Sequence, residues 1–295
     1  SPLNAVHNVI QYITIETLGN AQDFGDLATT AAQPGGVASR TRGVRMGGGA
    51  APSNAANNTI EFITIASTGD ATDFGDLVQK IRDTGSVGNQ TRGINGGGYT
   101  PTYVNTIQYI TIAATGNSVD FGDLSNTLSR SCRTQVNSAV RGIFAGGYTP
   151  GSPANVVFNT IEYVTISTTG NAQDFGDLTS VRNRFSGGCN STRGIFGGGR
   201  NPAGTDNRVK TIDFITIATL GNAQDFGDTS PDVQSRPGAS SSTRGVFFGG
   251  TEPSPDYTNA IEYITIAQTG NALDFGDLIF KNTGGFGISN GHGGL

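Results

Sequence analysis

The chain carries six copies of an alternating run of the form I-x-[YF]-[IV]-T-I, the first at residues 10–15 and the last at residues 261–266. β-Branched and aromatic residues that alternate with polar ones predict a strand. The motif D-F-G-D begins eight residues after the last Ile of every run, beyond a turn such as T-G-N. Because this spacing is the same in all six copies, we predict a hairpin whose register is set by its turn.

The rest of each repeat predicts two further strands. After D-F-G-D the chain becomes small and polar, as in S-G-G-C at residues 186–189, which suits a strand near a crowded axis. An R-G pair follows, then apolar residues and a glycine doublet or triplet. The segments between these glycines and the next alternating run vary in length and sequence; they are residues 50–57, 99–104, 148–158, 200–209 and 251–258. Constant hairpins beside variable loops predict a scaffold with one working face.

Successive D-F-G-D motifs lie between 47 and 54 residues apart, a period typical of stacked or radially arranged units. We predict one all-β domain over residues 1–295, a six-bladed β-propeller with four short antiparallel strands per blade. The first repeat lacks the R-G strand, and the residues after Leu278 contain a degenerate version of it. We therefore expect the N- and C-terminal strands to share one blade and to close the ring.

Composition and charge exclude several functions. Glycine accounts for 45 of the 295 residues and charged residues for 14%, which fits a turn-rich β protein. The net charge is −5 and Lys and Arg do not cluster, so no nucleic-acid partner is predicted. No apolar run approaches the ~20 residues that span a bilayer, so no membrane insertion is predicted. The first residues, S-P-L-N-A-V-H-N, predict no secretory signal.

The repeated motifs supply the framework residues. Six copies of D-F-G without an H-R-D loop exclude a protein kinase. We favour a structural role for the paired aspartates, with one accepting backbone N–H bonds and the other pairing with a repeated Arg. Weak calcium binding by the two aspartates and the turn Asn is the alternative, and no other cofactor or metal is predicted. The framework residues are Asp23, Phe24, Asp26, Asp73, Phe74, Asp76, Asp120, Phe121, Asp123, Asp174, Phe175, Asp177, Asp225, Phe226, Asp228, Asp274, Phe275 and Asp277, with Arg42, Arg92, Arg141, Arg193 and Arg244.

Aromatic and Arg residues of the variable loops are the candidate binding residues. They are Tyr99, Tyr103, Tyr148, Arg200, Arg208 and Tyr257. Tyr offers a flat apolar face and a hydroxyl at low entropic cost, which suits recognition of sugars or protein surfaces. Packing between blades as loop anchors is an equally good explanation for any single Tyr.

Catalysis finds no support in the sequence, and we predict that the chain is not an enzyme. The chain has no G-x-S-x-G motif and no His cluster. His7 and His292 lie near the two ends of the sequence and are expected to be incidental surface residues. Cys132 and Cys189 are expected to be small buried thiols, with their redox state left open.

Two resemblances add to this picture. An Arg-containing strand that ends in G-G, a variable loop and then I-x-Y resembles the kelch β-propeller repeat, although kelch blades usually carry a Trp where this chain has the Phe of D-F-G-D. The sequences of residues 159–178 and 191–199 also look like repeats of virion structural and tail-fibre proteins of marine, cyanophage-type bacteriophages. The second resemblance implies a location in the virion and other virion proteins as partners.

We therefore expect a non-enzymatic virion protein of a bacteriophage, as a tail-fibre or receptor-binding component that recognises a host-surface glycan or protein through its variable loops. One alternative is a secreted or cell-surface lectin or adhesion module. Another is a capsid or tail decoration or docking module with no receptor role. A homo-oligomer would be consistent with a fibre tip, but no residue pattern indicates a subunit interface.

Overall fold

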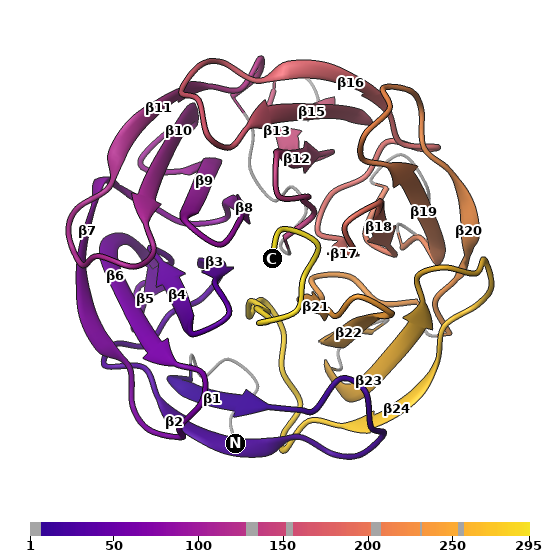
Figure 1. Cartoon of the computed structure of the whole chain (residues 1–295), viewed down its shortest axis with the longest axis horizontal. Coiled ribbons are helices and arrows are strands. Elements are labelled where there is room, and N and C mark those ends of the chain that lie inside the picture. The colour runs from indigo at the N-terminus through magenta and orange to yellow at the C-terminus, as the bar shows by residue number, and fades with distance from the viewer. Residues whose placement is uncertain (1–6, 128–134, 152–155, 202–207, 231, 253–256) are drawn as a thin grey trace.

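The chain folds as a ring of β-sheets around a central axis (Figure 1). This computed structural model describes residues 7–127, 135–151, 156–201, 208–230, 232–252 and 257–295. The described residues form 24 strands and no helix, and so no helix that could cross a membrane. The predicted all-β, propeller-type fold is confirmed.

Each blade is an antiparallel meander that runs from the axis to the rim. The five blades consist of β3 (Gly35–Ala38), β4 (Arg42–Met46), β5 (Gly49–Ala50), β6 (Ala55–Thr64) and β7 (Thr72–Ile81); β8 (Gly85–Gly88), β9 (Arg92–Tyr99), β10 (Tyr103–Thr111) and β11 (Val119–Asp123); β12 (Arg141–Ala145), β15 (Thr160–Thr165) and β16 (Gln173–Asp177); β17 (Ser186–Cys189), β18 (Arg193–Gly197), β19 (Thr211–Thr216) and β20 (Gln224–Asp228); and β21 (Gly238–Ser240), β22 (Arg244–Thr251), β23 (Tyr257–Thr265) and β24 (Leu273–Asp277). A short ribbon of β13 (Tyr148–Thr149) and β14 (Val156–Val157) extends the third blade.

The prediction of six four-stranded blades is wrong in its count. Among the described residues, the strands of the sixth sector are the hairpin of β1 (Val9–Tyr12) and β2 (Gln22–Asp26) and no others. The residues after β24 were expected to complete this blade, but they form no strand and run inward to the axis, where the chain ends (Figure 1). Six of the last twelve residues are glycine, which disfavours a regular strand. Their hydrogen bonds are irregular, such as the bond from Gln33 N–H to the Gly284 carbonyl.

Neighbouring sectors are joined at the rim by the same contact six times. The turn after one alternating run lies on the D-F-G-D strand of the preceding sector. At the joint between β16 and the next turn, the N–H of Gly221 donates to the Phe175 carbonyl (2.9 Å) and the N–H of Ala223 to the Asp177 carbonyl (2.8 Å). The N–H of Asp177 donates in return to Oδ1 of Asn222 (3.0 Å). The ring closes through the same three bonds between Phe275–Asp277 and residues 19–21.

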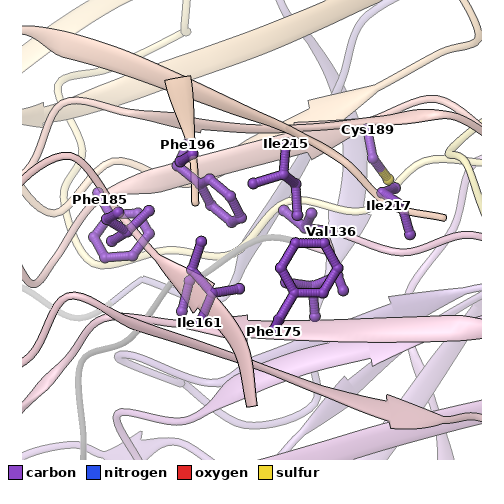
Figure 2. Packing of buried hydrophobic residues seen from close by; sticks show 12 residues of the cluster. Val136, Ile161, Phe175, Phe185, Cys189, Phe196, Ile215 and Ile217 are labelled. Atoms are coloured by element: carbon purple, nitrogen blue, oxygen red, sulfur yellow. The ribbon is translucent and has the colours of Figure 1, made fainter. Parts of the chain in front are cut away.

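The Phe of every D-F-G-D motif is buried. Phe175 is 2% exposed and meets the ring of Tyr163 edge-on, with centroids 6.2 Å apart. It belongs to a cluster that combines residues of the third and fourth blades, including Phe185 and Phe196 (Figure 2). Such shared clusters occupy the space between neighbouring blades, so a blade is stabilised by apolar packing on both of its faces.

The axis is lined by the small residues that the sequence predicted there and is occupied by the C-terminal residues. β3, β8, β17 and β21 are buried along their whole length. His292 is 3% exposed, contrary to the expected surface position. Its Nε2 donates to the Ala38 carbonyl (2.9 Å), while Nδ1 accepts from the amide of Asn137 (3.0 Å) and from the Gly294 N–H (3.1 Å). These partners require the neutral ring, because a proton on Nδ1 would face two donors.

We expect Phe175→Ala to destabilise the ring by about 3–5 kcal/mol, because the variant loses apolar burial and leaves a cavity between two blades. The free energy of unfolding in urea measures this. Leu273→Ala is the matched control, since Leu273 is apolar but 58% exposed. A loss under about 1 kcal/mol for Phe175→Ala would contradict the role assigned to this side chain.

Gly170 and Gly176 have similar φ angles but different space for a Cβ, so a comparison of their Ala variants isolates the effect of a steric clash at the rim joint. Gly170 has φ +154° and open space around a Cβ, whereas Gly176 has φ +145° and its Cβ would lie 2.6 Å from the carbonyl of Gly221. We expect Gly176→Ala to lower the free energy of unfolding by at least about 1 kcal/mol more than Gly170→Ala, because only Gly176→Ala forces neighbouring sectors apart. Equal losses would show that the close approach does not matter.

The neutral His292 predicts a pH dependence of stability. Burial lowers the pKa of His292 to about 4, against the weaker raising effect of its bond to Ala38. The unfolded chain, with a pKa near 6.5, therefore binds one more proton between about pH 6.5 and pH 4. We expect stability to be unaffected by this group above pH 6.5 and to fall by about 3 kcal/mol as the pH drops to 4. Denaturant unfolding of the wild type and His292→Gln across this range tests the prediction, and parallel pH profiles would refute it.

Candidate functional site

The variable loops and the blade-to-blade connections lie on one face of the ring. Because each blade is an up-and-down meander, the loop between its second and third strands emerges on the same side as the chain leaving its fourth strand. The two constant turns of each blade emerge on the opposite side. We call the first side the loop face. The sequence prediction of a face with variable loops therefore agrees with the strand order.

A hollow of about 360 Å³ opens on the loop face between the first and second blades, and we call it the loop-face pocket. Its wall is formed by residues 53–56 from the β5–β6 loop and the start of β6, by Lys80 and Arg82 at the end of β7 and beyond it, and by residues 99–101 at the end of β9 and beyond it. Two cationic side chains, one aromatic ring and the polar Ser53, Asn54 and Thr100 thus surround one space.

Arg82 is held in place by three partners. Its guanidinium lies over the Tyr99 ring, 4.6 Å from the centroid, and forms an ion pair with Asp83 (3.0 Å). Nη1 also donates to Oε1 of Gln33 (3.2 Å). The Arg82 side chain is 19% exposed, so part of it faces solvent. Lys80 is exposed and has no ion-pair partner among the residues that the structure describes.

The structure brings three of the predicted binding residues together. Tyr103 meets Tyr99 at a centroid distance of 5.1 Å and Tyr148 at 5.7 Å, and the hydroxyls of Tyr103 and Tyr148 lie 2.9 Å apart. Tyr99 and Tyr103 are half-buried and Tyr148 is buried, so this row links the second and third blades. Tyr99 alone of the three lines the loop-face pocket.

The other three predicted binding residues lie elsewhere on the ring and make contacts between loops. Arg208 donates from Nε to the Thr251 carbonyl (3.3 Å) and from Nη2 to the Glu252 carbonyl (2.7 Å). Arg200 pairs through its backbone with Asn183 and Arg208. Tyr257 is half-buried and lies opposite Thr251 in the β22–β23 ladder. All three help to hold the loops of the last two blades.

The repeated Arg residues do not pair with the D-F-G-D aspartates, which corrects the expected ion pairs. Arg193 lies over the Phe214 ring (4.9 Å) and donates to the carbonyl of Ile266 in the next blade (3.0 Å). Arg42, Arg92, Arg141 and Arg244 make the equivalent contacts. The reason is position: the arginines begin the second strand of each blade, whereas the aspartates lie on the fourth strand at the rim.

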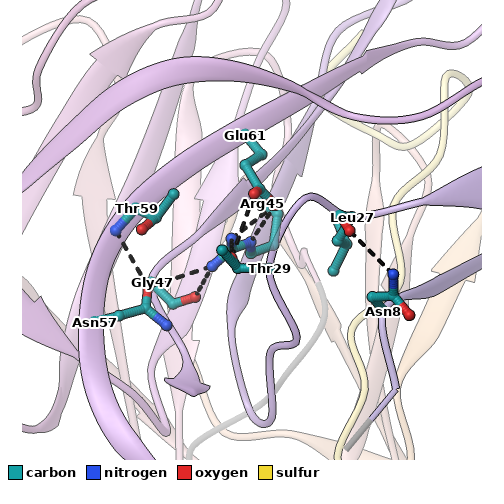
Figure 3. Close-up of polar contacts among 8 residues, drawn as sticks. All are labelled: Asn8, Leu27, Thr29, Arg45, Gly47, Asn57, Thr59 and Glu61. Atoms are coloured by element: carbon teal, nitrogen blue, oxygen red, sulfur yellow. Dashed lines mark hydrogen bonds and ion pairs between the residues drawn. The ribbon is translucent and has the colours of Figure 1, made fainter. Parts of the chain in front are cut away.

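Buried ion pairs form instead at an acidic position that the sequence analysis did not single out. Glu61 pairs with Arg45 (2.7 Å), and Arg45 also donates to the hydroxyl of Thr29 and the Gly47 carbonyl (Figure 3). The other pairs are Arg182–Asp213 and Arg236–Glu262. The recurring acid or amide after the first Ile of each alternating run was the available signal. Alternation suggested an exposed side chain, but both faces of a blade are covered by neighbours.

Calcium binding by the D-F-G-D aspartates is the alternative to a structural role. The turn Asn that would join them is already engaged at the rim joint, where its Oδ1 accepts the N–H of an Asp in the preceding sector. The residues that the structure describes contain no group of three or more His, Cys, Asp or Glu side chains able to hold a metal ion. Calcium binding stays an untested alternative.

The described cysteine and the two histidines lie in packed or hydrogen-bonded surroundings. Cys189 is buried and free, as expected, and burial raises the pKa of its thiol. Cys132 lies outside the described residues. His292 is enclosed at the axis, and His7 packs against Phe280 with ring centroids 4.9 Å apart. Lys80 and Arg82 were not among the predicted binding residues, although Lys80 is one of only three lysines in the chain.

Comparison with known proteins does not assign the site. No protein-family model matches the chain, and no curated protein matches it.

Proposed function

We propose that the chain is a non-enzymatic recognition module of a bacteriophage virion that binds a host-surface glycan through its loop face. The observation that carries the proposal is the loop-face pocket, in which Lys80 and Arg82 lie beside Tyr99. The resemblance of residues 159–178 to virion repeats supports the location, and other virion proteins are then the partners that hold the ring on the particle.

The chemistry of the pocket favours an acidic sugar. An aromatic ring suits the apolar face of a pyranose, and a fixed guanidinium suits a carboxylate or sulfate. Arg82 is pre-organised by Asp83, Gln33 and Tyr99, so little side-chain entropy is lost when a ligand binds. Asp83 compensates part of the charge of Arg82, and exposed Lys80 supplies a second cation.

The scaffold suits this role because the loops rest on fixed strands. Tyr99, Tyr103 and Tyr148 lock the loops of the second and third blades to each other. Variable loops on a rigid frame allow the ligand to change while the fold stays the same. Tyr103 and Tyr148 therefore act as supports for the pocket, and Tyr99 is the aromatic residue that touches the ligand.

Binding of the purified chain to an array of neutral and anionic glycans tests the proposal. We expect saturable binding to carboxylated or sulfated glycans, and a loss of at least tenfold in affinity for Lys80→Glu, about 1.4 kcal/mol, because a carboxylate replaces a cation at the pocket. Lys210→Glu is the matched control. Lys210 is also on the loop face and 49% exposed, but it lies near Asp232 and away from the pocket.

Three other outcomes would change the assignment. Equal losses for the two Lys variants would mean that general charge attracts the ligand and that the pocket does not recognise it. Loss of binding in a chelator would return the aspartates to consideration as calcium ligands. The absence of glycan binding, together with capture of another virion protein by the loop face, would favour the docking module.

A further inference from the structure

The part of the chain that the structure describes places no R-G strand in the sixth sector, although every blade contains one. In each of the five blades, the strand that begins with R-G lies between the innermost position and the alternating strand. β1 is the alternating strand of the sixth sector, and its only partner among the described residues is β2. Its other edge, facing the axis, therefore presents backbone N–H and C=O groups without a ladder.

A cavity of about 530 Å³ occupies the place of the missing strand. β1 forms its outer wall, and Phe286 and Ile288 of the C-terminal residues lie on the axial side. Phe62 and Ile63 of the first blade and Phe248 of the last blade line its flanks. The cavity is separate from the loop-face pocket, and the inference drawn from it does not rest on the proposed function.

Apolar side chains around this cavity are more exposed than their counterparts in the other sectors. Ile13 and Ile15 are half-buried, whereas the equivalent Ile264 and Ile266 are 2% and 0% exposed. Ile63 and Ile65, across the cavity on β6 and just beyond it, are also half-buried. A strand in the cavity would cover both sets of side chains.

The repeated Arg contact is also unoccupied at this one joint. In each blade the Arg at the start of the R-G strand stacks on an aromatic ring of its own blade and donates to an Ile carbonyl of the next. Arg244, for example, lies over Tyr263 (4.7 Å) and donates to the Ile15 carbonyl (3.0 Å). In the sixth sector the matching ring is Tyr12 and the matching acceptor is the Ile65 carbonyl. Neither has an Arg partner among the described residues, and Tyr12 is 39% exposed.

We propose that the cavity is an acceptor site for one extended strand of a partner polypeptide with the sequence R-G-[VI]-F followed by glycines. The β22–β23 register gives the pairing: Arg opposite Thr14, Gly opposite Ile13 and the β-branched residue opposite Tyr12. The partner Arg stacks on Tyr12 and donates to the Ile65 carbonyl. The small Gly lies beside Ile13, as Gly245 lies beside Ile264 in the last blade.

A separate polypeptide is favoured over a second copy of this chain. All five R-G strands of the chain, β4, β9, β12, β18 and β22, are paired with the alternating strands of their own blades. A second copy would have to open a blade to lend one of them and would lose as much pairing as it gained. A partner with an uncommitted strand has no such cost, and strand addition to an open sheet edge is an established mode of peptide recognition.

A synthetic peptide with the sequence of residues 191–199, S-T-R-G-I-F-G-G-G, tests the proposal with the full chain. We expect one peptide per chain by isothermal titration calorimetry, a raised Tm, and slower hydrogen exchange at β1 amides. Replacing the peptide Arg by Ala is expected to weaken binding at least fivefold, and Tyr12→Ala in the chain to weaken it by a similar factor. A scrambled peptide of the same composition and the chain variant Leu273→Ala, at an exposed site on β24, are the controls.

Each outcome of these experiments either supports or overturns the strand-acceptor proposal. Saturable binding that needs both the peptide Arg and Tyr12 supports the strand acceptor. Equal binding of the scrambled peptide, or no binding at millimolar peptide, overturns it. A chain that is already dimeric by light scattering, with β1 amides protected before peptide is added and no displacement by peptide, would show that a second copy covers the cavity and would also overturn the proposal.

Discussion

The ring depends on the approach of two glycines at each rim joint. The Gly of D-F-G-D, such as Gly176, and the Gly of the next turn, such as Gly221, come so close that a Cβ on the first would collide with the carbonyl of the second. This approach lets three hydrogen bonds form between sectors, including the one to Asn222 Oδ1. These bonds engage the outer backbone groups of the rim strand at Phe175 and Asp177, so the turn of one sector covers part of the rim edge of its neighbour.

Repetition of this joint explains why one face of the ring is constant and the other is free to vary. The T-G-N turn is committed to the neighbouring sector, so its length and sequence cannot change without loss of contact. The loops of the loop face do not form the rim joint. They are held by local contacts, which are made by tyrosines in one region and by Arg208 in another. The buried pairs Arg182–Asp213 and Arg236–Glu262 also link blade-to-blade connections to strands. Such pairs specify an arrangement more than they stabilise it, because desolvation of both charges is costly.

The sequence patterns predicted structure within one repeat. They did not predict contacts in which a residue's partner lies in another sector. The hairpins, the buried Phe175 and the small axial strands follow from spacing and side-chain size. The partners of Arg193 do not, because its acceptor is the Ile266 carbonyl, which is 73 residues away and carries no sequence signal. The pocket was missed for the same reason: Lys80, Arg82 and Tyr99 belong to two blades and meet only across their interface. Tyr148, for which the sequence left ligand contact and loop anchor open, is buried, because residue type alone does not distinguish an anchor from a contact.

The sixth sector shows that the two halves of a blade have separable roles. Its outer hairpin alone makes both rim joints, through Gly19 to Phe275 and through Phe24 to Gly69, so the ring closes without the inner strands. The inner half governs burial: where the R-G strand is absent, Ile13, Ile15, Ile63 and Ile65 keep apolar surface in contact with a cavity. The C-terminal residues recover part of this by placing Phe286 and Ile288 against Gly36 and Gly43 and by fixing His292 at the axis. Closure and burial are therefore provided by different segments, which is what allows this sector to close the ring while its apolar side chains stay partly exposed to a cavity.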